Sequence, residues 1–187
     1  MQMPQPATTP RSLDAPEFDV DPQHFKGALS QFATGVTVVT TIGLDGRPVG
    51  LTASSFNSVS LAPPLVLWSL SMHAASLPAF QLHTHYAVNV LAADQLALAR
   101  RFASRDIDRF AGVPFRLGRG GAPVLDGCVA WFECFNRSRH EEGDHVIFVG
   151  QVEACGYEAG QPLLFHGGQL LDDAPLGVTP PADTPPP

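Results

Sequence analysis

The pattern of hydrophobic positions changes its period several times along the chain, and the first period is helical. Phe25, Leu29 and Phe32 recur at the spacing of one helix face. Asp21 before them can cap a helix, and Pro22 suits the first helical turn. We therefore expect a helix that begins at about residue 22, ahead of a β-rich body.

Short β-branched or alternating segments follow, separated by glycine and proline. Residues 36–42 read VTVVTTI, which favours a strand, and the Asp-Gly pair at 45–46 is typical of a tight hairpin. A partner strand is expected from about residue 48. The further strands that the pattern predicts are 65–70, 86–91, 128–135, 145–155 and 163–165.

The stretch 51–61 alternates loosely, so its buried side is predicted from three positions. Phe56, Val59 and Leu61 are the candidates, and Pro63-Pro64 then breaks the chain. Six or more short strands with few helices indicate a small antiparallel barrel.

Two short helices are expected among these strands. One covers about 74–80. The other is capped by Asp94 and places Leu98 and Phe102 on one face, with Arg101 and Arg105 turned outward.

Composition favours a single domain. The chain has 187 residues, 44% of them hydrophobic, which suits one packed core. Proline and small polar residues dominate both ends, so we expect a disordered extension at 1–20 and a disordered Pro-rich tail at 172–187. The folded domain is then 21–171.

Charge and cysteine content exclude several classes of protein. The net charge of −7 argues against nucleic-acid binding, and apolar runs such as 63–70 are too short for a membrane helix. Neither a secretory signal nor a disulfide framework is expected. Cys128, Cys134 and Cys155 are an odd number and are predicted to be free, buried thiols of a cytoplasmic protein.

Common catalytic motifs are missing from the sequence. It contains no G-x-S-x-G, G-x-x-x-x-G-K-[ST], G-x-G-x-x-G or H-E-x-x-H motif. His83 and His85 have no third metal ligand nearby, so no metal site is predicted.

Hydroxyl side chains crowd one predicted strand and its exit. Thr52, Ser54 and Ser55 are followed by Asn57 and Ser58. Short hydroxyls and closely approaching backbone N–H groups can hold a phosphate or a polar ring edge. A polar strand face followed by a turn explains the same residues, and composition leaves both interpretations open.

A Gly-Asp-His triplet precedes the apolar strand at 146–149. His145 at a strand entrance is ordinarily a surface residue, but the Asp144 carboxylate can orient its imidazole. Gly143 would let a ligand approach the backbone.

Taken in order, the segments resemble the flavin reductase family, the reductase components of two-component monooxygenases. The segments that carry the resemblance are FKGALSQFATGVTVVTT (25–41), GLTASSFNSVSLAPPLVLWSL (50–70), YAVNVLAADQLALARRFAS (86–104), GDH (143–145) and PLLFHGG (162–168). The resemblance implies an FMN-binding split β-barrel, closed and with Greek-key connections, that forms a homodimer with the flavin near the interface.

The resemblance also implies a set of site residues. FMN or FAD would contact Gly35, Val36, Thr37, Thr52, Ala53, Ser54, Ser55, Ser69, Leu70, Ser76, Arg101 and Phe102. Arg101 would serve the phosphate, since its guanidinium offers a fork of donors. Leu70 and Met72 depart from the family, where polar residues often stand.

His145 and Asp144 would be the catalytic residues. His145 would position NADH or NADPH or share a proton with the flavin, and Asp144 would hold the tautomer of His145. No general base is required, because the hydride passes directly between the two rings.

The sequence therefore predicts an NAD(P)H-dependent flavin reductase that supplies reduced flavin to a partner monooxygenase. A non-catalytic flavin-storage protein on the same barrel is the main alternative. An enzyme of the pyridoxamine-phosphate oxidase type would need more basic residues around a substrate phosphate, and it is disfavoured because Lys26 is the only lysine in the sequence.

Overall fold

A computed structural model describes residues 19–173, and the fold is mainly β as predicted. The expected extension at 1–20 and tail at 172–187 lie almost wholly outside these residues. The helices are α1 (Pro22–Ser30), α2 (Leu77–Leu82) and α3 (Leu96–Ala103), with 3₁₀ turns η1 (Ala93–Gln95) and η2 (Arg119–Gly121). The strands are β1 (Thr34–Gly35), β2 (Thr37–Ile42), β3 (Pro48–Ala53), β4 (Asn57–Leu61), β5 (Pro64–Ser71), β6 (His85–Val90), β7 (Phe115–Leu117), β8 (Pro123–Leu125), β9 (Ala130–Glu142), β10 (His145–Tyr157), β11 (Leu164–His166) and β12 (Gln169–Leu171).

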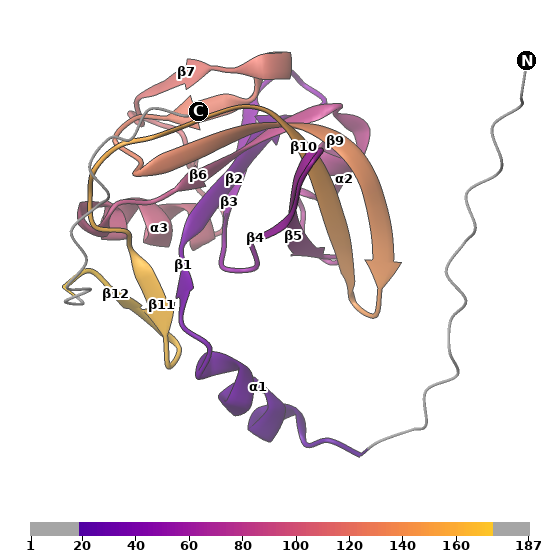
Figure 1. The fold of residues 1–187 in the computed structure, drawn as a ribbon, viewed down its shortest axis with the longest axis vertical. Coiled ribbons are helices and arrows are strands. Elements are labelled where there is room, and N and C mark those ends of the chain that lie inside the picture. Colours follow the sequence, from indigo (N-terminus) through magenta and orange to yellow (C-terminus); the bar gives the residue numbers. More distant parts are fainter. Residues whose placement is uncertain (1–18, 174–187) are drawn as a thin grey trace, which may run out of the picture.

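Seven strands form one curved antiparallel sheet in the order β3-β2-β6-β9-β10-β5-β4 (Figure 1). The chain passes from β3 at one edge directly to β4 at the other, the kind of crossing connection that Greek-key barrels use. The predicted barrel is confirmed, but its ladder does not close, because β3 and β4 are not hydrogen-bonded to each other. At one end of this opening, residues 51–55 at and just after the end of β3 lie beside the end of β5, and we call that place the seam.

The segment expected to complete the barrel belongs to a separate small sheet. β11 pairs with β1 and β12, so residues 163–165 do not extend the main ladder. β7 and β8 form a further two-stranded ribbon that the sequence did not indicate.

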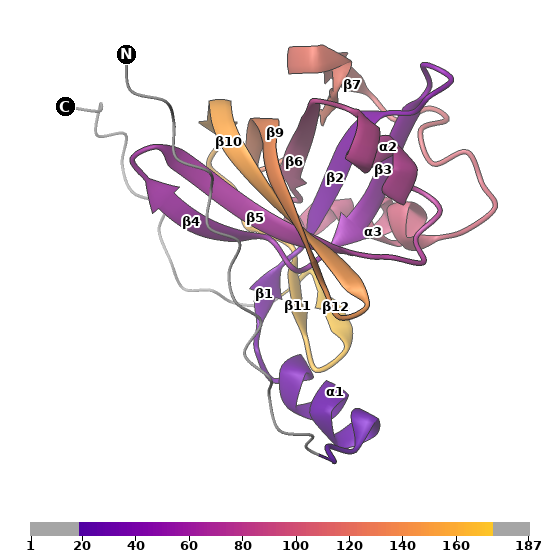
Figure 2. The same ribbon diagram turned by 90° about the vertical axis from the view of Figure 1, so that its right-hand side faces the viewer.

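The first helix forms where the capping signal predicts it. The side chain of Asp21 accepts a hydrogen bond from the backbone N–H of His24 at 2.7 Å. None of the residues of α1 is buried, and both views show the helix projecting from one end of the barrel (Figures 1 and 2). Among residues 19–173, its apolar face, formed with the following Phe32, is therefore exposed.

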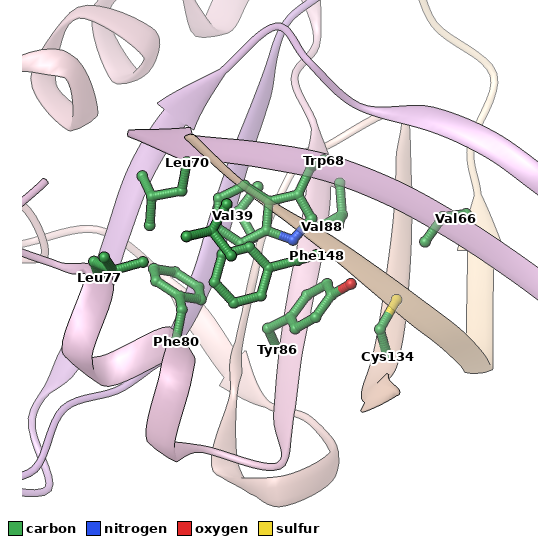
Figure 3. Packing of buried hydrophobic residues seen from close by; sticks show 11 residues of the cluster. Val39, Val66, Trp68, Leu70, Leu77, Phe80, Tyr86, Val88, Cys134 and Phe148 are labelled. Carbon is green, nitrogen blue, oxygen red and sulfur yellow. The ribbon is translucent and has the colours of Figure 1, made fainter. Parts of the chain in front are cut away.

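Four aromatic side chains form the centre of the barrel (Figure 3). Trp68 on β5 stacks on Phe148 with ring centroids 4.8 Å apart, and the edges of Phe80 and Tyr86 meet it at 4.9 and 5.8 Å. Every second residue of β5 points into this cluster, which leaves Ser69 and Ser71 on the other face of the strand.

The predicted buried side of β4 is wrong. Val59 is 48% exposed and Leu61 is 93% exposed, and Phe56, just before the strand, is only partly buried against Phe132. The pairing of β4 with β5 shifts between Ser58 and Ser60, and such a bulge disturbs the alternation of side chains between the two faces.

Other boundaries also differ from the predictions. The second helix begins later than expected, and Asp94 lies inside η1, while the side chain of Gln95 accepts from the N–H of Ala92 at 3.0 Å. β9 continues to Glu142, so that β9 and β10 form one long hairpin that turns at Gly143 (φ +61°).

The three cysteines are free, and two are buried as predicted. Burial raises the pKa of Cys128 and of Cys134 to about 12, so both are protonated, unreactive thiols at neutral pH. Cys155 is exposed on β10, where alternate residues face outward, and the prediction of its burial is wrong.

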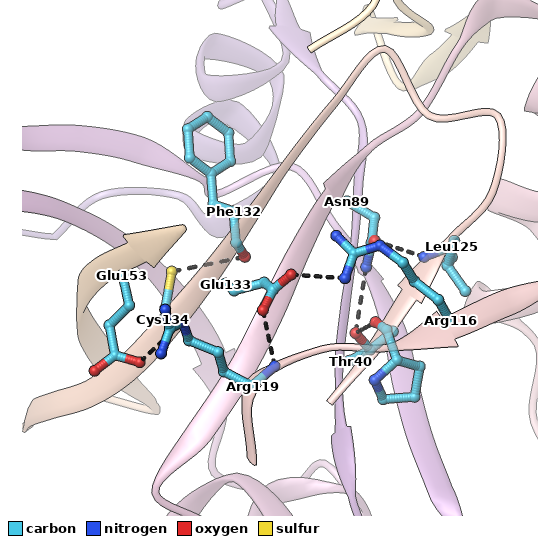
Figure 4. Close-up of polar contacts among 10 residues, drawn as sticks. Thr40, Asn89, Arg116, Arg119, Leu125, Phe132, Glu133, Cys134 and Glu153 are labelled. Carbon is cyan, nitrogen blue, oxygen red and sulfur yellow. Dashed lines mark hydrogen bonds and ion pairs between the residues drawn. The ribbon is translucent and has the colours of Figure 1, made fainter. Parts of the chain in front are cut away.

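A charged group is buried on the side of the sheet covered by β7 and β8 (Figure 4). One carboxylate oxygen of Glu133 accepts from Arg116 and the other from the backbone N–H of Arg119, both at 2.8 Å. Arg116 also lies 4.4 Å from the ring centre of Trp131. These contacts satisfy the carboxylate and hold the ribbon on the sheet.

Candidate functional site

A pocket of about 320 Å³ lies at the seam. It forms where three segments of the chain meet: the end of β3, the end of β5 and the start of β10. Its lining residues are Leu51, Thr52, Ala53, Ser54, Ser55, Ser69, Leu70, Ser71 and His145. Seven of these are residues that the sequence analysis proposed for flavin contact or catalysis, although they come from three segments of the chain.

Hydroxyl groups join the two strands that border this pocket. The hydroxyl of Ser55 donates to the carbonyl of Ser69 at 3.1 Å and accepts from its N–H at 2.9 Å. Thr52 donates to the carbonyl of Ala99 on α3 at 2.7 Å. The hydroxyls of Ser55 and Thr52 thus donate to backbone carbonyls of the protein itself, and each can still accept a further hydrogen bond. The exposed Ser54 hydroxyl has no intramolecular partner within residues 19–173.

A second pocket of about 580 Å³ adjoins the seam pocket and shares Leu51, Thr52 and Leu70 with it. Ser76 and Phe102, both proposed from the sequence, line it. Two arginines and a histidine that were not predicted from the sequence, Arg105, Arg109 and His73, also line it, together with one carboxylate, Asp106. We call it the basic pocket, because it can offer positive charge to an anion.

The structure does not bring Arg101 into the basic pocket. Its guanidinium donates to the carbonyl of Asp108 at 3.2 Å, within the loop that follows α3. Arg109 in the same loop donates to the carbonyl of Gly50 at 2.7 Å and to that of Ser104 at 2.9 Å. Arg109 therefore ties this loop to β3 and fixes the wall of the pocket.

Gly35, Val36 and Thr37 lie beside the end of β3 but line neither pocket. Thr37 pairs with Ala53 and donates its hydroxyl to the Ala53 carbonyl at 2.8 Å. Val36 is buried against α3 and Leu163. In the described part of the chain, these residues therefore pack beside the strand end that lines the seam pocket and do not line the pocket themselves.

His145 reaches the seam because β10 pairs with β5. Its partner in the register is Ser71, so the histidine stands at the exit of the strand that carries Ser69. Its Nδ1 lies 2.7 Å from Oδ1 of Asp144. A carboxylate only accepts, so Nδ1 carries the proton and Nε2 of a neutral imidazole remains an acceptor.

The charge state of Asp144 is fixed by the same contact. The hydrogen bond from His145, together with the charge of that imidazole, holds the pKa of the Asp144 carboxyl below its usual range. Asp144 is therefore ionised at neutral pH and keeps the tautomer of His145 that the sequence analysis expected.

Residues 19–173 contain no group of three or more histidine, cysteine or acidic side chains placed to hold a metal ion. The Nε2 atom of His85 instead lies 3.3 Å from Oε2 of Glu153. No helix within the same residues is long and apolar enough to cross a membrane.

Comparison with known proteins adds a family match. The sequence model described as "Flavin reductase like domain" matches residues 29–172, which contain all of the lining residues above. The chain is 46% identical over 144 residues to the FMN reductase (NADH) SmoA of Agrobacterium fabrum, covering 77% of this chain and 82% of that one.

Two further relatives match this chain over most of their own length. A flavin-dependent monooxygenase reductase subunit, HsaB of Rhodococcus jostii, is 40% identical over 162 residues, covering 86% of this chain and 83% of that one. Among solved structures, the NADH:FAD oxidoreductase SgcE6 of Streptomyces globisporus, in complex with NAD and FAD fragments, superposes with a TM-score of 0.78. It is 40% identical and covers 87% of this chain and all of that one.

Proposed function

The chain belongs to the flavin reductase family, and from that premise we propose that it reduces free flavin with NADH or NADPH and releases it to a separate monooxygenase. The observation that supports this function most is the seam pocket. It gathers the hydroxyl cluster and the Asp144–His145 pair, which lie about ninety residues apart in the sequence.

The pockets suit the chemical parts of a flavin nucleotide. The seam pocket offers hydroxyls, strand-end backbone groups and a histidine, which match the polar edge of an isoalloxazine ring. The adjoining basic pocket offers Arg105, Arg109 and Ser76 to a phosphate. Of the residues proposed from the sequence, Ser54, Ser69 and Ser76 would contact the flavin directly, while Ser55 and Thr52 would place them.

The protein contributes position and charge to the reaction. Bound flavin supplies the hydride acceptor, and the nicotinamide must lie against its ring. His145 lines the seam pocket, and its Nε2 atom would orient the nicotinamide or exchange a proton with the flavin. Asp144 keeps that nitrogen unprotonated while the imidazole is neutral.

An anaerobic assay tests the function. Purified protein with FMN or FAD and an excess of NADH should remove the yellow absorbance of the flavin over many turnovers. The storage alternative predicts tight binding without turnover. Retention of the flavin through gel filtration is the second readout, because a protein that delivers flavin should lose it to the column. A protein that retains flavin and does not bleach it would contradict the proposal.

We further infer that the chain forms a homodimer through the exposed apolar face of α1. Phe25, Leu29 and Phe32 are 54–71% exposed, and a face of this kind is ordinarily covered by another surface. Replacing Phe32 with aspartate should convert the dimer to a monomer in size-exclusion chromatography with light scattering, because burying a carboxylate costs several kcal/mol. Leu117→Asp, at an exposed leucine on β7, is the matched control. A wild-type monomer would overturn this inference.

A further inference from the structure

A third pocket, of about 610 Å³, continues from the basic pocket. The two pockets are adjacent, because Ala75, Ser76, Asp106 and Arg109 line both of them. The basic pocket in turn shares Leu51, Thr52 and Leu70 with the seam pocket. The three pockets therefore follow one another along a single groove.

The walls of the third pocket differ from those of the basic pocket. Apolar side chains contribute most of its surface, among them Leu44, Val49, Ile107 and Phe110. Ile107 is 51% exposed and Leu44 is 70% exposed, so both present apolar surface to the groove's opening. Such walls suit a flat, uncharged ring.

The charged groups at this pocket are mostly acidic. Asp45, Asp106 and Asp108 line it, and Arg109 at the shared wall is its one cation among the described residues. Carboxylates repel a second phosphate but accept hydrogen bonds from sugar hydroxyls or an exocyclic amine. The pocket is thus matched to a nucleoside, with the phosphates held at the arginines beside it.

The wall between the two pockets is held in place. Arg109 donates to the carbonyl of Gly50 on β3, 59 residues earlier in the chain. Phe110 packs edge-on against Phe102 of α3, with ring centroids 4.9 Å apart. A Cβ at Gly50 would lie 2.7 Å from the ring of Phe102, so only glycine lets the loop and helix pack this closely.

We propose that the third pocket receives the adenosine of FAD, and that the chain prefers FAD to FMN as the flavin it reduces. The inference rests on the proposed function and adds its substrate preference. The ring would lie at the seam, the diphosphate at Arg105 and Arg109, and the adenosine against Ile107 and Leu44. FMN ends at its phosphate and would leave the third pocket empty.

Binding measurements test this preference independently of turnover. Quenching of flavin fluorescence gives the Kd of each flavin, and we expect the Kd for FAD to be lower than that for FMN by about tenfold or more. Ile107→Asp and Leu44→Asp each add a negative charge and remove apolar contact in the third pocket. Either variant should raise the Kd for FAD by about tenfold and leave the Kd for FMN within about twofold of wild type.

Leu117→Asp is the matched control, because it makes the same substitution at an exposed leucine outside the groove. It should leave both dissociation constants unchanged. All three positions are exposed, and circular dichroism verifies that each variant is folded.

Three results would overturn the proposal. One is equal binding of the two flavins by the wild-type chain, and another is an equal loss of FAD and FMN affinity in the third-pocket variants. The last is a KM for NADH that is higher in the third-pocket variants than in the wild type with either flavin, which would assign the pocket to the nicotinamide dinucleotide. If the wild-type chain binds and reduces neither flavin, the proposed function itself fails, so the two failures are distinguishable.

Discussion

Replacing His145 with alanine should lower kcat/KM for NADH by about 10- to 100-fold. A hydrogen bond to a charged group contributes about 1.5–3 kcal/mol, and each 1.36 kcal/mol is a factor of ten in rate. The flavin should still bind, because the hydroxyls of the seam and the arginines of the basic pocket are untouched. Stopped-flow measurement of flavin bleaching at saturating flavin isolates the affected step.

The matched control lies on the same hairpin. His140 is an exposed histidine of β9 that lines none of the pockets at the groove, so His140→Ala removes an imidazole without changing the site. It should retain the wild-type rate. Equal rates for His145→Ala and the wild type would remove His145 from the mechanism.

The pH profile separates the two roles open to His145. If it shares a proton with the flavin, the bleaching rate of the wild type should depend on pH, and that dependence should vanish in His145→Ala. If it only orients the nicotinamide through a hydrogen bond, His145→Gln should recover much of the rate. Asp144→Asn should have a smaller effect than His145→Ala, because an amide oxygen can still accept from Nδ1 but carries no charge.

Local signals in the sequence were sufficient to predict the start of the first helix and two of the tight turns. The cap at Asp21 and the Asp-Gly turn at 45–46 depend on neighbouring residues only, and both form as predicted. The Gly-Asp-His triplet does lie at a strand entrance, because Gly143 supplies the positive φ that turns β9 into β10.

Contacts between distant residues were the part that the sequence could not supply. Arg109 belongs to the groove only because it reaches Gly50 on another element, and nothing in its neighbours indicates that contact. Arg101 and Arg109 are two arginines of one segment, yet only Arg109 faces the pocket. A count of the arginines at 100, 101, 105 and 109 would have marked the segment but not the residue.

The errors in burial have a similar cause. Alternation at 51–61 predicted that Val59 and Leu61 would be buried, but a shift in pairing at an edge strand changed the face they occupy. The open seam could not be predicted from local patterns either, because the pairing of the edge strands depends on the arrangement of the whole sheet. The resemblance to a family supplied candidate residues that local patterns did not, among them Ser69, Leu70, Ser76 and Phe102, which line the pockets of the groove.

Replacing Trp68 with alanine should destabilise the folded chain by about 3–5 kcal/mol, the usual cost of truncating a buried aromatic side chain. Trp68 is fully buried and contacts the rings of Phe148, Phe80 and Tyr86. Domains are stable by only about 5–15 kcal/mol, so this one change removes a large part of the total. Urea unfolding followed by circular dichroism, at fixed protein concentration, measures the loss.

The indole N–H of Trp68 sharpens this prediction. Within residues 19–173 it has no hydrogen-bond partner, although it is buried. Leaving a buried donor unpaired costs about 1–3 kcal/mol, so Trp68→Phe should offset part of its lost packing by removing that donor. We therefore expect Trp68→Phe to cost less than about 1.5 kcal/mol. Leu44→Ala, at an exposed leucine, should change stability by less than about 0.5 kcal/mol.

The comparison of these variants also bears on the site. Trp68 immediately precedes Ser69, whose backbone is held by Ser55 across the seam, so loss of the ring should loosen both partners. Flavin affinity should then fall in Trp68→Ala but not in Trp68→Phe, when both are measured well below their unfolding temperatures. If the alanine variant unfolds as the wild type does, the aromatic cluster does not hold the barrel, and the seam must be fixed by β9 and β10 instead.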